Sequence, residues 1–132
     1  MKTKIFSGLA LAGAALAIAG MAFAQSGYSK WYYLNGSSGV DVYYSVRVDQ
    51  SEIRVMWKCV NTTSTAKSCS VGAGQEKIYF CRANGSGVGS TNSLGERATV
   101  NANAEYVFPS DFACRGLGAT EVQPSVRISI EN

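Results

Sequence analysis

Four cysteines are the residues of this chain with the most evident chemistry: Cys59, Cys69, Cys81 and Cys114. Cysteines can ligate zinc, act as nucleophiles or pair as disulfides. No C-x-x-C pair is present, and the chain has no histidine to complete a mixed zinc site or to activate a catalytic thiol. An even number of cysteines in a short exported chain is typical of a disulfide framework. We therefore predict two disulfides and interpret the cysteines as structural.

The pairing of these cysteines is not determined by their number, since four cysteines allow three connectivities. We favour Cys59–Cys69 together with Cys81–Cys114. The first pair would close a polar loop, and the second would tie a strand to a late loop. On the loop-entropy model each closure contributes about 3–4 kcal/mol. That is a large share of the stability of a domain that buries only about two-thirds of its unfolded surface.

The remaining residues offer little for catalysis. Without histidine the chain cannot form a Ser-His-Asp or Cys-His centre. The closest group of carboxylates, Asp41, Asp49 and Glu52, is expected to be solvated at the rim of a hairpin. Residues 83–95, ANGSGVGSTNSLG, lack the Lys-Ser/Thr end of a phosphate-binding loop, so we expect a flexible surface loop there. We expect a protein that is not an enzyme and uses no metal or cofactor.

Residues 1–24 are predicted to be a cleaved, helical signal peptide of bacterial type. Lys2 and Lys4 precede an apolar run, and Ala22-Phe23-Ala24 supplies small residues at the positions that a signal peptidase reads. A transmembrane anchor is the alternative, because the run approaches the roughly 20 apolar residues that span a bilayer. The run is rich in Ala and Gly, however, and ends in a good cleavage site. Residues 25–132 are therefore expected to form a single domain, secreted or periplasmic, without stable membrane insertion.

Cleavage would change the charge of the protein. It removes two of the 12 Lys and Arg residues and none of the 9 Asp and Glu residues, so the net charge falls from +3 to +1. The mature chain then lacks the basic surface that nucleic-acid-binding domains carry. We expect no nucleic-acid partner.

Alternation of apolar and polar residues indicates that the mature chain is made of half-buried strands. Residues 40–49 alternate, and so does the next run, which places Ile53, Val55, Trp57 and Cys59 on one face. The connection between the two is short enough for a hairpin. Further strands are predicted at 30–34, 76–82, 98–108 (as one strand or two) and 122–130, the last beginning at a sheet edge because Pro124 cannot donate a hydrogen bond. Three Asn-x-Ser/Thr sequences, at Asn35, Asn61 and Asn84, are interpreted as turns.

Short strands joined by Gly- and Ser-rich loops predict an all-β fold. We expect a small antiparallel β-sandwich of about six to seven strands, stabilised by the two disulfides. It would be Ig-like only in the loose sense, because the Cys…Trp…Cys spacing of immunoglobulin domains is missing: Trp57 comes just before Cys59. A small barrel is the alternative.

Aromatic residues are concentrated between Trp31 and Tyr44, and this stretch is the candidate binding surface. We nominate Trp31, Tyr33 and Tyr43, with Asp41 as a polar partner on the same outward face as Tyr43. Exposed aromatic rings stack on the apolar faces of sugars, and the same composition suits a protein interface. Packing in the core or at a sheet edge is the alternative, because Tyr and Trp favour strands.

The predicted function is therefore a secreted or periplasmic, non-enzymatic binding module for a glycan or protein partner. Two alternatives remain. The protein could inhibit a foreign hydrolase by inserting a loop such as residues 83–95 into its active site. It could also be a structural subunit of a surface assembly, in which an edge strand pairs with a neighbour.

Overall fold

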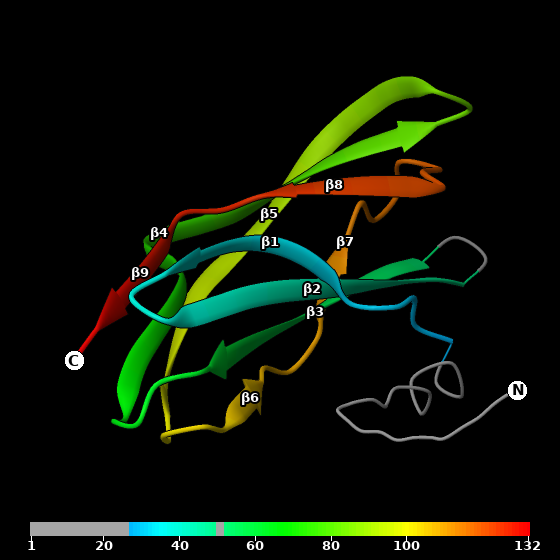
Figure 1. Cartoon of the computed structure of the whole chain (residues 1–132). Coiled ribbons are helices and arrows are strands. Elements are labelled where there is room, and N and C mark those ends of the chain that lie inside the picture. Colours follow the sequence, from blue (N-terminus) through cyan, green and yellow to red (C-terminus); the bar gives the residue numbers. More distant parts are fainter. Residues whose placement is uncertain (1–26, 50–51) are drawn as a thin grey trace, which may run out of the picture. The chain divides into compact units, whose positions relative to one another are not determined.

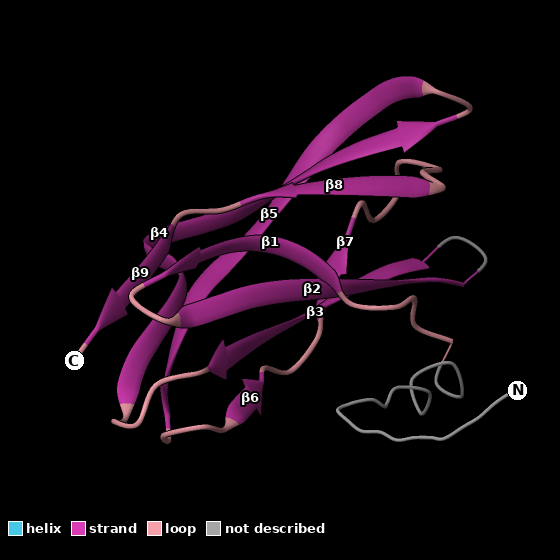
Figure 2. Cartoon of the chain, viewed as in Figure 1, coloured by secondary structure: helices cyan, strands magenta, loops and turns pink. Residues whose placement is uncertain are grey.

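Strands account for all regular secondary structure in the residues that the structure describes (Figure 2). The computed structural model describes residues 27–49 and 52–132, so the predicted signal peptide lies outside the described residues. All described strands belong to one compact unit, Trp31–Asn132. Its strands form two antiparallel sheets (Figure 1), which confirms the predicted all-β sandwich.

The first sheet, sheet A, contains five strands: β1 (Tyr32–Ser37), β2 (Val40–Asp49), β3 (Glu52–Asn61), β6 (Glu105–Val107) and β7 (Asp111–Ala113). β1, β2 and β3 are successive antiparallel neighbours, and both β6 and β7 pair with β3. Ser38 and Gly39 form the turn between β1 and β2, and both have positive φ. At the other end of β2, Asp49 pairs with Glu52, in agreement with the predicted hairpin.

The second sheet, sheet B, contains four strands: β4 (Lys67–Ala83), β5 (Ser86–Val100), β8 (Glu121–Ser125) and β9 (Ile128–Glu131). β4 and β5 form a long hairpin whose tip, at the upper right of Figure 1, is the pair Asn84–Gly85. The expected flexible loop over residues 83–95 is therefore wrong, because most of it lies in β5. Asn84 and Gly85 both have positive φ, and an Asn-Gly turn of this kind matches the twist of the strands it joins.

Alternate residues of both sheets point between them and form one core. The predicted inward face of β3 is confirmed, since Ile53, Val55, Trp57 and Cys59 are all buried. The sequence pattern left open which face of β4 points inward, because both faces carry apolar residues. In the structure the inward residues of its middle section are Lys77, Tyr79 and Cys81, whereas Ile78 and Phe80 are exposed on the outer face.

Each sheet has one edge that consists of two short strands. β6 pairs with residues 58–60 of β3, and β7 pairs with residues 53–55. β8 and β9 likewise pair with two separate parts of β4, and Pro124 lies in the edge strand β8 as expected. The predicted runs 98–108 and 122–130 are thus each divided in two. These divisions, together with β7, which lies outside every predicted run, explain why the described residues form nine strands instead of about six or seven.

Two disulfides connect the strands of sheet A to sheet B. Cys59–Cys69 links β3 to β4, and Cys81–Cys114 links β4 to the residue that follows β7. Both predicted pairings are confirmed, and no cysteine is free to ligate a metal or to act as a nucleophile. Disulfides form and persist in oxidising compartments, so the protein is suited to such an environment.

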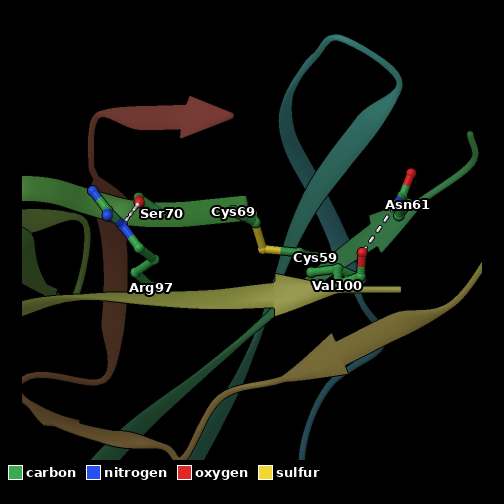
Figure 3. Close-up of a disulfide and its surroundings, with 6 residues drawn as sticks. All are labelled: Cys59, Asn61, Cys69, Ser70, Arg97 and Val100. Atoms are coloured by element: carbon green, nitrogen blue, oxygen red, sulfur yellow. Dashed lines mark hydrogen bonds between the residues drawn. A yellow bond between two sulfur atoms is a disulfide. The ribbon is translucent and has the colours of Figure 1, made fainter. Parts of the chain in front are cut away.

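A buried amide reinforces the region of the Cys59–Cys69 bond (Figure 3). Asn61 is the last residue of β3 and is only 1% exposed. Its Nδ2 donates to the carbonyl oxygens of Thr65, Val100 and Asn101 at 2.9, 3.0 and 3.2 Å. Its Oδ1 accepts hydrogen bonds from the backbone N–H and the hydroxyl of Thr63. The interpretation of Asn61 as a turn residue is therefore wrong.

The other two asparagines of the Asn-x-Ser/Thr sequences differ from each other. Asn84 lies at the tip of the β4–β5 hairpin, as the turn interpretation requires. Asn35 lies within β1, so that interpretation is wrong for it as well. The local sequence is similar at all three positions, and only the pairing with other strands separates them.

We expect the oxidised protein to contain no titratable thiol and to weigh about 4 Da less than its reduced form, because each disulfide removes two hydrogens. Peptide mapping should join Cys59 to Cys69 and Cys81 to Cys114. Reduction should lower the melting temperature by many degrees, since the unfolded chain regains loop entropy. Two or more free thiols in the native protein would contradict this result.

Replacing Trp57 by alanine should lower the free energy of unfolding by about 3–5 kcal/mol, as large aromatic truncations in cores do. Trp57 is fully buried, and its indole N–H donates to the Tyr79 hydroxyl at 2.8 Å. Tyr43→Ala, on the outward face of β2, is the matched control and should cost much less. Denaturant unfolding of the two variants measures the difference, and equal losses would show that both faces of sheet A are structurally equivalent.

Candidate binding face on sheet A

The four residues nominated as a binding surface lie together on the outward side of sheet A. Tyr33 in β1 is the direct cross-strand partner of Tyr43 in β2, and Tyr43 is in turn the partner of Lys58 in β3. Asp41 lies two residues before Tyr43, so both side chains project from the same side of β2. Trp31 immediately precedes β1, and its ring contacts the Lys58 ammonium.

The aromatic residues of the stretch 31–44 are divided between the two sides of the sheet. Tyr32 and Tyr44 are cross-strand partners whose ring centroids are 5.5 Å apart, and Tyr44 lies 5.7 Å from the ring of Trp57 in the core. The core-packing alternative therefore holds for Tyr44. Tyr33 does not pack in the core, because it is 58% exposed, but it lies in the edge strand β1 and contacts Tyr43 edge to face at 5.7 Å, so packing at a sheet edge stays an alternative for it.

Lys58 connects the aromatic side chains to a second carboxylate. Its Nζ lies 4.6 Å from the ring centroid of Trp31 and 5.5 Å from that of Tyr43. The same nitrogen is 3.1 Å from Glu105 Oε1 in β6. Aromatic ring faces attract cations, so Lys58 holds the two rings and the carboxylate in one group. We call this group the aromatic face: Trp31, Tyr33, Asp41, Tyr43, Lys58 and Glu105.

A glycine allows the Asp41 carboxylate to approach Tyr33. Gly36 in β1 is the cross-strand partner of Asp41. A Cβ atom at position 36 would lie 2.4 Å from Asp41 Oδ1 and 3.0 Å from the Tyr33 hydroxyl oxygen. Both polar groups therefore occupy the space over Gly36 that any other side chain would fill. The Asp41 carboxylate and the hydroxyl of the exposed Tyr33 ring therefore converge over Gly36.

The surroundings of Tyr43 keep its hydroxyl protonated. Partial burial raises the pKa of Tyr43, and the nearby groups Asp41, Tyr33 and Glu105 raise it further. A tyrosine in this state remains a hydrogen-bond donor at neutral pH and into the alkaline range. The face thus offers two phenol hydroxyl groups, one ammonium and two carboxylate acceptors around its aromatic rings.

An open hollow of about 350 Å³ adjoins the aromatic face at Glu105. It lies between the end of β3 and the turn before β6, and its walls include Val60, Thr62 and Asn103. Val60 is the cross-strand partner of both Asp41 and Glu105, so the hollow continues the row of side chains that contains the two carboxylates.

Lys58, Glu105 and Gly36 are the parts of this face that sequence reasoning missed. The alternation of β3 already placed Lys58 on an outward side, but nothing in the local pattern connected it with Trp31 or Tyr43. Glu105 lies 47 residues after Lys58 and joins it only through the pairing of β6 with β3. Long-range strand register is therefore the missing information.

The chain matches no protein-family model, and no curated protein or solved structure shows significant similarity to it. Within residues 27–49 and 52–132, no three metal-ligating side chains lie close enough to hold an ion. The same part of the chain contains no helix that could span a bilayer. The chemistry of the aromatic face is therefore the basis for assigning a function.

Asp41→Asn should lower the pKa of Tyr43 toward its ordinary value, because the substitution removes a negative charge that opposes ionisation of the phenol. Partial burial of Tyr43 would still keep its pKa above the ordinary value. NMR titration of ring-labelled tyrosine measures the shift. Asp49→Asn, at the far end of the same strand, is the control and should leave Tyr43 unchanged. An unaltered Tyr43 titration in Asp41→Asn would show that the carboxylate does not act on the phenol.

Proposed function

We propose that this protein is an exported, non-enzymatic binding module that recognises a glycan through the aromatic face. The observation that carries the proposal is the exposed ring of Tyr33, which is held edge to face by Tyr43 and lies beside the Asp41 carboxylate. An aromatic ring can stack on the apolar face of a sugar while a neighbouring carboxylate accepts hydrogen bonds from its hydroxyl groups.

The charge of the aromatic face favours a glycan over a protein partner. Asp41, Lys58 and Glu105 make up half of its six residues and lie among the rings. The fully buried centre of a protein interface is depleted of charged residues, especially Lys, Asp and Glu. A sugar, by contrast, presents many hydroxyl groups that can exchange hydrogen bonds with such side chains while part of the site stays hydrated. A protein partner is therefore the secondary alternative.

Export is part of the proposal. The n-region, the apolar run and the Ala22-Phe23-Ala24 sequence support cleavage after residue 24. The two disulfides support folding in the periplasm or outside the cell. After cleavage the chain would start at Gln25, carry the domain without a membrane anchor, and bind without a metal or cofactor. For the inhibitor alternative, the inserted element would be the tip of the β4–β5 hairpin, because residues 86–95 belong to β5.

The proposal is tested by measuring retention of the mature protein on immobilised polysaccharides and cell-envelope glycans. Loss of a stacked ring costs on the order of 1–2 kcal/mol, so Tyr33→Ala should weaken binding roughly 5- to 30-fold. Asp41→Asn should weaken it by a similar factor, and a chelator should have no effect. Since Tyr33 is exposed, its variant should keep the melting temperature of the parent protein.

Phe80→Ala is the matched control, because Phe80 is an aromatic residue that is 49% exposed on the outer face of the other sheet. It should retain full binding. Binding that survives Tyr33→Ala and Asp41→Asn would contradict the proposal, and binding that depends on Phe80 would move the site to sheet B. Retention on envelope proteins but on no glycan would favour the protein partner. Self-association through a strand edge would favour a structural subunit.

A further inference from the structure

A lysine side chain is completely buried between the two sheets. Lys77 lies in β4, points toward sheet A and has an exposed fraction of 0%. The next inward residue of the same strand is Tyr79, which belongs to a core that also contains Val55 and Trp57. Lysine is almost never fully buried unless it is paired. The side chain therefore needs an explanation in terms of its partners.

Two carboxylates from different strands approach the Lys77 amine. Asp111 Oδ2, at the start of β7, lies 2.8 Å from Lys77 Nζ, and Glu96 Oε2, in β5, lies 3.7 Å away. The Tyr79 hydroxyl donates a hydrogen bond to the same oxygen of Asp111. Tyr79 in turn accepts a hydrogen bond from Trp57 Nε1 at 2.8 Å. The amine, the acids and a phenol donor are thus held together by strands of both sheets.

This arrangement is not that of an ordinary, fully hydrogen-bonded ion pair. Among the described residues, neither Lys77 Nζ nor Glu96 Oε1 has a partner in hydrogen-bond geometry, although Nζ lies within ion-pair distance of both acids. A buried charge pair is unfavourable unless its remaining hydrogen-bonding capacity is satisfied. The Lys77 amine therefore lies at short range from the Asp111 carboxyl group without the hydrogen bonds that would stabilise it as an ion.

We infer that Lys77 and Asp111 condense to form an intramolecular amide bond between the two sheets, with Glu96 carrying the proton that the reaction must move. The bond would join Lys77 Nζ to Asp111 Cγ. The two disulfides already link β4 to β3 and to the residue that follows β7, so this amide would be a third covalent link from β4.

The reaction balances without any co-reactant. A proton passes from the ammonium to the adjacent carboxylate, which gives a neutral amine and a carboxylic acid. The Nζ lone pair attacks Asp111 Cγ, and Glu96 takes a proton from the nitrogen. Glu96 then gives this proton to the departing hydroxyl, so that a C–N bond forms, a C–O bond breaks and one water leaves. Nothing is oxidised or reduced, and Glu96 returns to its starting state.

The site supplies the factors that such a condensation needs. Two reacting groups fixed in contact have effective molarities that can reach about 10⁵ M or more. Tyr79 donates to Asp111 Oδ2, where negative charge develops when the amine adds to the carboxyl carbon. Burial raises the pKa of Tyr79, as does its hydrogen bond to Asp111, so the phenol keeps the proton that it donates. Amide formation also removes two charges from the core, which eliminates their desolvation cost.

The test is the mass of the mature protein after reduction of its disulfides. The wild-type chain should weigh one water less than its sequence requires. Trypsin should not cleave after Lys77, and tandem mass spectrometry should find the Lys77 peptide joined to the Asp111 peptide. Cyclisation of Gln25 at the new N-terminus would remove ammonia instead of water, and peptide mapping distinguishes the two. Protein that was folded and oxidised but has the full sequence mass after reduction, with an unlinked Lys77, would overturn the inference.

Three variants distinguish an amide bond between Lys77 and Asp111 from a simple ion pair. Glu96→Gln keeps the size of the side chain but cannot accept the proton, so the folded variant should show a large loss of cross-linked product. Lys77→Met removes the nucleophile and should have its full mass. The control is Glu121→Gln at the Arg82–Glu121 pair, in which the two side chains are 3.7 Å apart and 47% and 60% exposed, and this variant should cross-link at Lys77 like the wild type. Cross-linking that is unchanged in Glu96→Gln would contradict the role of Glu96. If a variant does not fold, the wild-type mass and peptide map still decide.

Discussion

Four side chains on the inward face of β4 are joined to partners outside sheet B by two disulfides, a hydrogen bond and an ion-pair contact, and they hold the two sheets in one relative position. The pairs are Cys69 with Cys59, Lys77 with Asp111, Tyr79 with Trp57, and Cys81 with Cys114. They are distributed along most of the strand, so a shift of one sheet over the other would break several of them together. Buried charges and buried hydrogen bonds have strict geometric requirements, and packing of apolar side chains alone is more tolerant of such a shift.

The same interactions also fix the position of the aromatic face, although it lies on the side of sheet A that faces away from the core. β2 and β3 present their inward residues to the core and their outward residues, Asp41, Tyr43 and Lys58, to solvent. Because the backbone of β3 is tied to sheet B through Cys59 and Trp57, the outward side chains start from fixed positions. A site on a rigid sheet loses less conformational entropy on binding than a site on a mobile loop. This supports recognition of a ligand whose groups are themselves regularly spaced.

Local patterns predicted the fold class and the inward face of β3, because alternation is a property of short segments. The number of cysteines and the absence of histidine predicted two disulfides, and the favoured pairing came from the segments that each bond would join. Local patterns also placed Tyr43 and Asp41 on one side of a strand. They did not predict the hairpin at Asn84–Gly85, since its second strand is rich in Gly, Ser and Asn and resembles a loop. The inward position of Lys77 was not predicted, because a lysine among the inward residues of β4 interrupts the alternation of apolar and polar residues. Glu105 joins the aromatic face through a pairing that no local pattern contains.

Because the amide of Asn61 is buried and also lies in an N-glycosylation sequence, folding depends on whether the host cell glycosylates this residue. Asn61-Thr62-Thr63 is an acceptor sequence for oligosaccharyl transferase, and that enzyme would attach its sugar to Nδ2. In the folded protein this nitrogen donates to three backbone carbonyl groups, and Asn61 is only 1% exposed. A eukaryotic secretory pathway that modified the nascent chain before β3 met β5 would therefore place a sugar on the atom that makes these hydrogen bonds. A bacterial envelope without this transferase leaves the asparagine free to complete the fold.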